Sequence, residues 1–99
     1  MMRIELNDKV LENVYAGVDY PVYMQTYSPC VSSGYLALRN DTGYDSSNEI
    51  GCLWPGSSMT VIGDPIGDYV LVEVNSTASG PWGSNVDGRV GYVNYRYLQ

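Results

Sequence analysis

The segment YVLVEVN, Tyr69 to Asn75, decides the fold class of this 99-residue chain. Valine occupies every second position from 70 to 74, and the positions between hold Leu71 and Glu73. A two-residue period is that of a β-strand with one buried face, and β-branched residues fit a pleated surface well. The segment therefore predicts a strand with Val70, Val72 and Val74 on one face and Tyr69, Leu71 and Glu73 on the other.

The sequence around this strand predicts further strands joined by turns. DPIGD (64–68) precedes it and reads as a turn, because proline presets one turn position and glycine allows positive φ at another. Before that turn, SSMTVIGD (57–64) predicts a strand with Met59 and Val61 on one face. After the long loop STASGPWGSNVD (76–87), GRVGYVNYRYLQ (88–99) predicts a short strand followed by a single 3₁₀ turn.

The middle of the chain continues the pattern. SGYLALRN (33–40) alternates and places Leu36 and Leu38 inward, and IGCLWPG (50–56) is an extended segment that ends in a turn. The nine polar residues DTGYDSSNE (41–49) between them form an irregular connection, where function often resides. We therefore expect an all-β fold, a small five- to six-stranded barrel with a closing 3₁₀ turn.

Residues 1–28 differ from the rest and form an N-terminal extension to a barrel of residues 29–99. Apolar residues recur at three- and four-residue spacing between Val10 and Val18, which predicts a short helix, and PVYMQTY (21–27) predicts an extended edge segment. The extension either covers an open sheet edge or is a linker from a preceding domain.

Composition excludes several classes of partner. Eleven acidic and five basic residues give a net charge of -6, which opposes binding to nucleic acid or to anionic lipid. The N-terminus carries Glu5, Asp8 and Glu12 where a signal peptide needs an apolar stretch, and no apolar run reaches the ~18 residues of a membrane span. Neutral or cationic ligands remain, and we expect a monomer.

The two cysteines, Cys30 and Cys52, leave two interpretations open. A disulfide between them closes a loop of about twenty residues and contributes roughly 3 kcal/mol. Alternatively, both are reduced thiols that act as small hydrophobic side chains. With no histidine in the chain, two cysteines do not complete a zinc site, so we expect neither metal nor cofactor.

Four motifs in order resemble the bacterial SH3-like (SH3b) domain family over Cys30 to Leu98. They are GYLALRN (34–40), EIGCLWPGSSMTVIGD (49–64), YVLVEV (69–74) and GRVGYVNYRYL (88–98). The resemblance implies an SH3-like barrel that targets a secreted, extracellular or cell-wall associated protein to peptidoglycan, often to its peptide bridges. The leader of such a protein is not in this chain.

The chain departs from the family at its aromatic positions. Tyr69 and Tyr92 stand where the family commonly has tryptophan, and the loop around Trp82 is longer than usual. The motifs also echo the SH3 domains that bind proline-rich peptides. Arg39-Asn40 stand where those domains have Tyr-Asp, and Asn94 stands where their Pro-x-Asn ending begins. Two positions that build the peptide groove are thus lost, so we do not expect binding of that kind.

The residues do not predict an enzyme. Serines and cysteines have no histidine to activate them, and the only lysine is Lys9. The carboxylate pairs Asp41 with Asp45 and Asp64 with Asp68 read as turn residues rather than acid and base. A weak calcium site in NDTGYDSSNE (40–49) is the lesser alternative for the first pair.

Large side chains on loops point to binding. Tyr44 and Trp82 are the rings that core packing explains least, although each is equally well read as a packed anchor of its loop. Trp54 is better explained as a partly buried core residue than as a ligand contact. Around Tyr44, three carboxylates, Asp41, Asp45 and Glu49, suit a ligand with a free ammonium group, such as a stem peptide or bridge.

In the closing segment, Tyr92 and Leu98 are expected inward, and Tyr95 and Tyr97 are the surface candidates, of which Tyr95 is a candidate ligand contact. The sequence thus predicts a non-catalytic domain that binds peptidoglycan or a peptide. The alternative is an interaction or spacer domain that packs on a neighbouring domain.

Overall fold

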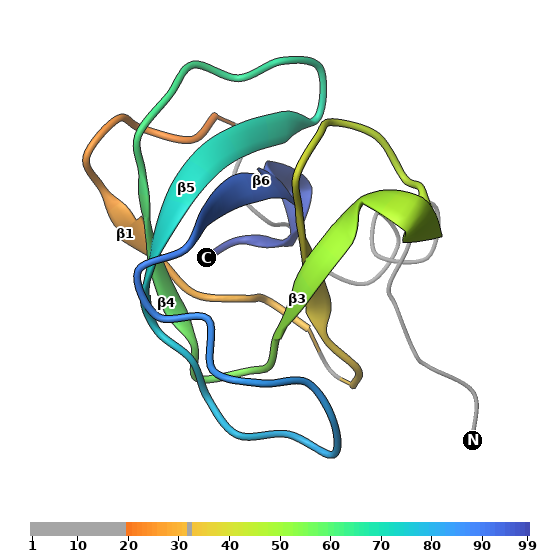
Figure 1. Ribbon diagram of the computed structural model, residues 1–99. Helices are drawn as coiled ribbons and strands as arrows, with labels where there is room; N and C mark the ends of the chain where they lie inside the picture. Colours follow the sequence, from red (N-terminus) through yellow and green to blue (C-terminus); the bar gives the residue numbers. More distant parts are fainter. Residues whose placement is uncertain (1–19, 32) are drawn as a thin grey trace.

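The computed structural model describes residues 20–31 and 33–99, which fold as an all-β structure (Figure 1). The expected helix between Val10 and Val18 lies outside the described residues. The elements in chain order are β1 (Thr26–Tyr27), β2 (Leu36–Arg39), η1 (Ser46–Asn48), β3 (Glu49–Leu53), β4 (Ser58–Val61), β5 (Tyr69–Ser76), β6 (Val90–Asn94) and η2 (Tyr95–Tyr97). Both η elements are 3₁₀ turns.

The strands form one antiparallel sheet in the order β1-β4-β5-β6-β2-β3. The predicted valine strand is the long β5, which pairs with β4 on one side and β6 on the other. The sheet curves strongly in Figure 1, and the C-terminal segment returns to the start of the described chain, where Pro29 bridges Leu98. This arrangement confirms the all-β prediction and is consistent with a small SH3-like barrel.

The main core lies inside the curve of the sheet. Val70, Val72 and Val74, which alternation placed on one face of β5, are at most 1% exposed. Leu36 and Leu38 of β2 also point inward as expected. Residues from β3, β4 and β6, one residue of the loop before β6 and the end of the chain complete this core: Leu53, Met59, Val61, Val86, Val93, Tyr97 and Leu98.

A second, smaller cluster covers the outer face of the β2–β3 hairpin. It contains Tyr35, Ala37, Cys52 and Trp54, all buried, with Ala78 and Trp82 packed against them. Strand β2 is therefore buried on both faces, whereas its alternation predicted one buried face. The loop between β5 and β6 supplies the additional cover.

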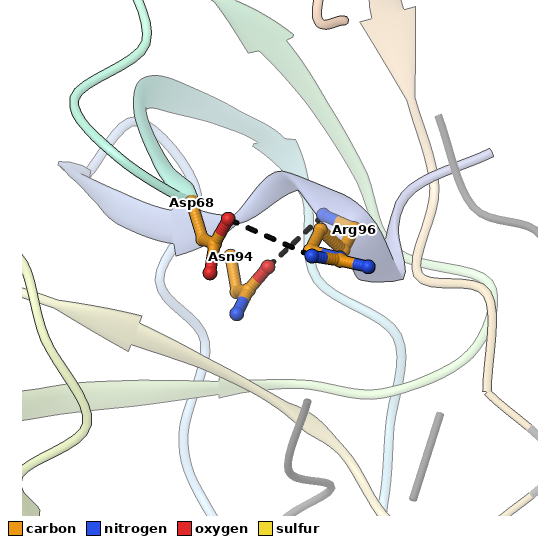
Figure 2. Close-up of polar contacts among 3 residues, drawn as sticks. All are labelled: Asp68, Asn94 and Arg96. Carbon is orange, nitrogen blue, oxygen red and sulfur yellow. Dashed lines mark hydrogen bonds and ion pairs between the residues drawn. The ribbon is translucent and has the colours of Figure 1, made fainter. Parts of the chain in front are cut away.

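Local polar contacts hold the closing segment in place (Figure 2). Asn94 Oδ1 accepts a hydrogen bond from the Arg96 amide at 3.0 Å and so caps η2. The Tyr95 amide donates to the Asp68 carbonyl at 3.0 Å, and Arg96 Nη1 lies 3.9 Å from Asp68 Oδ1. These contacts tie η2 to the turn that precedes β5, so the chain ends in ordered structure.

Two expectations about the closing aromatics were wrong. Tyr97, expected at the surface, is 3% exposed and belongs to the main core, because η2 turns it inward beside Leu98. Tyr92, expected inward, is only half-buried. Alternation along β6 gives the inner face to Gly91 and Val93 instead, which are both buried.

Cys30 and Cys52 are both free cysteines in this structure. Cys52 lies in the outer cluster under Trp54. Cys30 lies beside the end of the chain, where its amide donates to the Tyr97 carbonyl. The two cysteines thus belong to different parts of the packing, and Cys52 acts as a small buried side chain.

Gly91 permits the close contact between β6 and β2. A Cβ at this position would lie 2.7 Å from the Arg39 carbonyl oxygen, which is backbone and does not yield easily. We expect Gly91→Ala to lower the free energy of unfolding by about 2–3 kcal/mol through overpacking. Gly67→Ala is the control, because its Cβ meets open space and only its φ of +61° costs about 1 kcal/mol. Equal losses in urea unfolding would contradict this account of Gly91.

Candidate functional site

Arg39 organises the loop of residues 41–49, called the acidic loop below. Its side chain is 2% exposed, and Nη1 donates to the Asp45 carbonyl and to Asn48 Oδ1, each at 2.8 Å. Asn48 Nδ2 in turn donates to the Gly43 carbonyl at 3.1 Å. A buried charge is costly unless it is hydrogen-bonded, so the loop has to keep these acceptors around the guanidinium.

Tyr44 stacks on Arg39 and also faces solvent. The Arg39 Cζ lies 5.0 Å from the ring centroid, a cation–π contact worth roughly 0.5–2 kcal/mol. The side chain is nevertheless 61% exposed. The contact with Arg39 fits the reading of Tyr44 as an anchor of its loop, and most of the residue remains accessible to solvent.

The carboxylates beside Tyr44 have local roles. Asp45 Oδ1 accepts from the Ser47 amide at 2.9 Å and caps η1, and Asp41 Oδ1 accepts from the Thr42 amide at 2.8 Å. The hydrogen bond from the Ser47 amide holds the pKa of Asp45 below its ordinary value of 3.8. Both residues are exposed and lie in the same loop as Tyr44.

Three rings pack on the outer face of the β2–β3 hairpin. The Trp54 and Trp82 centroids lie 5.2 Å apart with planes at 75°, and Tyr35 lies 5.4 Å from Trp54 and 6.2 Å from Trp82. Trp54 Nε1 donates to the Trp82 carbonyl at 2.9 Å. Trp54 is thus core, as predicted, while Trp82 folds back and keeps part of its surface exposed.

Glycines allow the loop of residues 77–87, called the Trp82 loop below, to lie flat on this cluster. Any Cβ on Gly80 would overlap the Trp54 ring. Gly83 has a φ of +92° and a Cβ there would lie 3.2 Å from the Cys52 Cβ. The indole Nε1 of Trp82 is buried, and no described residue accepts its hydrogen. An unsatisfied donor of this kind costs roughly 1–3 kcal/mol.

A cavity of about 180 Å³ lies between Trp54 and the Trp82 loop. Nine residues line it, none of them charged: Trp54, Thr77, Ala78, Ser79, Gly80, Trp82, Gly83, Ser84 and Asn85. Of these the sequence singled out only the two tryptophans. The sequence indicated only that the serines and Asn85 lie in a loop. Their contribution to the cavity depends on how that loop folds back.

The base of the Trp82 loop is closed by Thr77. Its hydroxyl donates to Asp87 Oδ1 at 2.7 Å and accepts from the Val86 amide at 3.0 Å. The Thr77 hydroxyl is also the main reason that the pKa of Asp87 lies below its ordinary value of 3.8. The strands β5 and β6 thus fix both ends of the loop.

Tyr35 links the two candidate surfaces. Its ring contacts Trp54 and Trp82, and its hydroxyl donates to Glu49 Oε1 at 2.9 Å at the far end of the acidic loop. The hairpin thus brings Trp82 and the acidic loop to one outer face. Tyr95 is not part of this face, since it lies in η2 and packs against the main core.

Neither a metal site nor a membrane span was found in the described part of the chain. Its carboxylates and cysteines form no group of three or more that could hold a metal ion, which gives the calcium alternative no support. Among the same residues, no helix has the length and apolar character needed to cross a bilayer.

No protein-family model, curated protein or solved structure matches the chain. The resemblance to SH3b domains therefore rests on the motifs quoted above and on the all-β fold.

The lowered pKa values of Asp45 and Asp87 predict acid sensitivity of both loops. A folded-state pKa below the unfolded one gives stabilisation that is present above the unfolded pKa and is lost as pH falls through the folded pKa. We therefore expect the urea midpoint to fall between about pH 5 and pH 2, less steeply in the double variant Asp45→Asn, Asp87→Asn. Asp64→Asn, an exposed change outside both loops, is the control. An unchanged slope in the double variant would contradict these roles.

Proposed function

We propose that this chain is a non-catalytic binding domain that recognises cell-wall peptidoglycan through its acidic loop. One observation carries the proposal: the Tyr44 ring is held on Arg39 while the residue stays 61% exposed, in the same loop as the exposed Asp41 and Asp45. A preformed aromatic face beside negative charge suits a ligand with an ammonium group and an apolar stem.

The strength of each contact fits binding to a polymer. An exposed ion pair contributes at most about 1 kcal/mol, and a cation–π contact at an exposed site about the same. Such a site binds one ligand weakly. A wall polymer presents many copies of the same group, so a protein with several attachment points gains avidity without new contacts.

The resemblance to SH3b domains supports the same proposal. It predicts a domain of a secreted protein that is held at the cell wall, with the free amino groups of stem peptides or bridges as the cationic ligand. The net charge of -6 agrees with a cationic rather than an anionic partner.

One observation favours the alternative, an interaction or spacer domain. Tyr20, Val22, Tyr23 and Met24 are 49–65% exposed and precede the edge strand β1. Met24 is held at a φ of +69°, and its amide donates to the Val61 carbonyl at 2.8 Å. An ordered apolar turn on the surface suits contact with a neighbouring domain.

Retention on insoluble wall sacculi tests the proposal. We expect the wild-type domain to sediment with purified sacculi, and the double variant Tyr44→Ala, Asp45→Asn to lose roughly tenfold in affinity, which corresponds to about 1.4 kcal/mol. Asparagine is chosen at position 45 because its side-chain oxygen can still cap η1, so that only the charge is removed.

Glu73→Gln is the matched control, because it removes an exposed charge from β5 outside the acidic loop. Raised salt should weaken retention, since exposed charges are screened. Absence of retention at low salt, or equal retention of the double variant, would overturn the proposal. If Tyr23→Ser instead abolished binding to a neighbouring domain, the alternative would be supported.

A further inference from the structure

The cavity beside Trp54 and Trp82 is a second candidate binding site, apart from the acidic loop. None of its nine lining residues carries a charge, although the chain has a net charge of -6. A charged ligand would lose water here without gaining a partner of opposite charge, which is unfavourable. The cavity therefore selects an uncharged ligand.

The size of the cavity limits the ligand to one ring or one short group. Its volume of about 180 Å³ is below the ~300–1,000 Å³ of sites that hold drug-sized molecules. It is also bounded by a single loop and Trp54, and does not extend along the sheet as a groove for an extended peptide would.

The lining combines apolar faces with hydrogen-bonding groups. Two indoles provide the apolar surface, while Ser79, Ser84 and Asn85 provide hydroxyl and amide groups. Neither serine hydroxyl has a hydrogen-bond partner among the described residues. Asn85 uses its Oδ1 to accept from the Asp87 amide at 2.9 Å, which leaves its Nδ2 for a ligand oxygen. Such a lining fits a ligand with one apolar face and several hydroxyl or amide groups.

Trp82 adds an independent observation. Its Nε1 donor is buried without an acceptor among the described residues, while the ring edge borders the cavity. The indole therefore gains from a ligand oxygen that a small shift of the Trp82 loop brings within reach.

We propose that this cavity binds one uncharged N-acetylated hexosamine ring. The acetamido group supplies a methyl for the indoles, a carbonyl oxygen as acceptor and no charge, and the ring hydroxyls match the serines and Asn85. The inference rests on the proposed function, because rings of this class form the glycan strands of peptidoglycan. The acidic loop then contacts the peptide part of the polymer and the Trp82 loop its glycan.

Intrinsic fluorescence tests the inference directly, because the chain has two tryptophans and both line the cavity. The full chain is titrated with the disaccharide of N-acetylglucosamine. Glucosamine, which is cationic, and N-acetylglycine amide, a peptide-like probe, are titrated in parallel. We expect a saturable change of emission with the acetylated sugar alone. No change, or a change with the peptide-like probe instead, would overturn the inference.

Variants that fill the cavity test whether the ligand binds there. Ser84→Leu and Ser79→Leu each place an apolar side chain at its wall and leave both tryptophans in the sequence, and both serines are exposed, so either change should leave folding intact. We expect each variant to weaken sugar binding by about tenfold or more. Ser46→Leu in the acidic loop is the matched control and should bind as wild type. Equal losses in the three variants would place the ligand elsewhere and contradict the inference.

The two proposals fail separately. If sacculi retain the domain and the acetylated sugar gives no fluorescence change, the cavity is not a glycan site and wall binding stands. If the sugar binds in the cavity and sacculi do not retain the domain, the cavity assignment stands and the wall as target is wrong.

Discussion

Burial of both faces of β2 is the constraint on which the loops of this domain depend. The inner face of Leu36 and Leu38 belongs to the main core, and the outer face of Tyr35, Ala37 and Arg39 is buried as well. Neither a neighbouring strand nor a described helix covers that outer face, so two loops do. The acidic loop closes over Arg39 at one end, and the Trp82 loop closes over Tyr35 at the other.

The two loops are held by different forces. The acidic loop is held by hydrogen bonds to a buried guanidinium, each worth about 1.5–3 kcal/mol because the donor is charged. The Trp82 loop is held by ring packing, with about 0.5–1.5 kcal/mol for each aromatic pair beyond the area buried. The cost of burying the Nε1 donor of Trp82 without an acceptor among the described residues offsets part of this packing energy. The acidic loop is therefore the more firmly fixed surface, and the Trp82 loop is the one that can adjust to a ligand.

The sequence predicted the sheet well because alternation reports which face is buried. It grouped the valines of β5 on one strand face and Met59 with Val61 on one face of β4, and both groups lie in the core; it also placed the 3₁₀ turn at the end of the chain. It failed where burial depends on a segment distant in sequence. The alternation of β2 did not reveal that Arg39 would be enclosed by Asn48, or that residues 77–87 would return over Cys52 and Trp54. For the same reason it named Tyr44 and Trp82 as site candidates but missed Ser79, Ser84 and Asn85, and it placed Tyr97 at the surface.

Backbone amide chemical shifts during titration with soluble wall fragments, produced by glycan digestion of sacculi, test the central claim most directly. The claim is that one outer face, made by the acidic loop and the Trp82 loop, carries recognition. It predicts saturable shift changes at residues 44–49 and 77–85, joined through Tyr35, while the turn at residues 64–68 stays unchanged. Shift changes confined to residues 20–24, or to that turn, would contradict it.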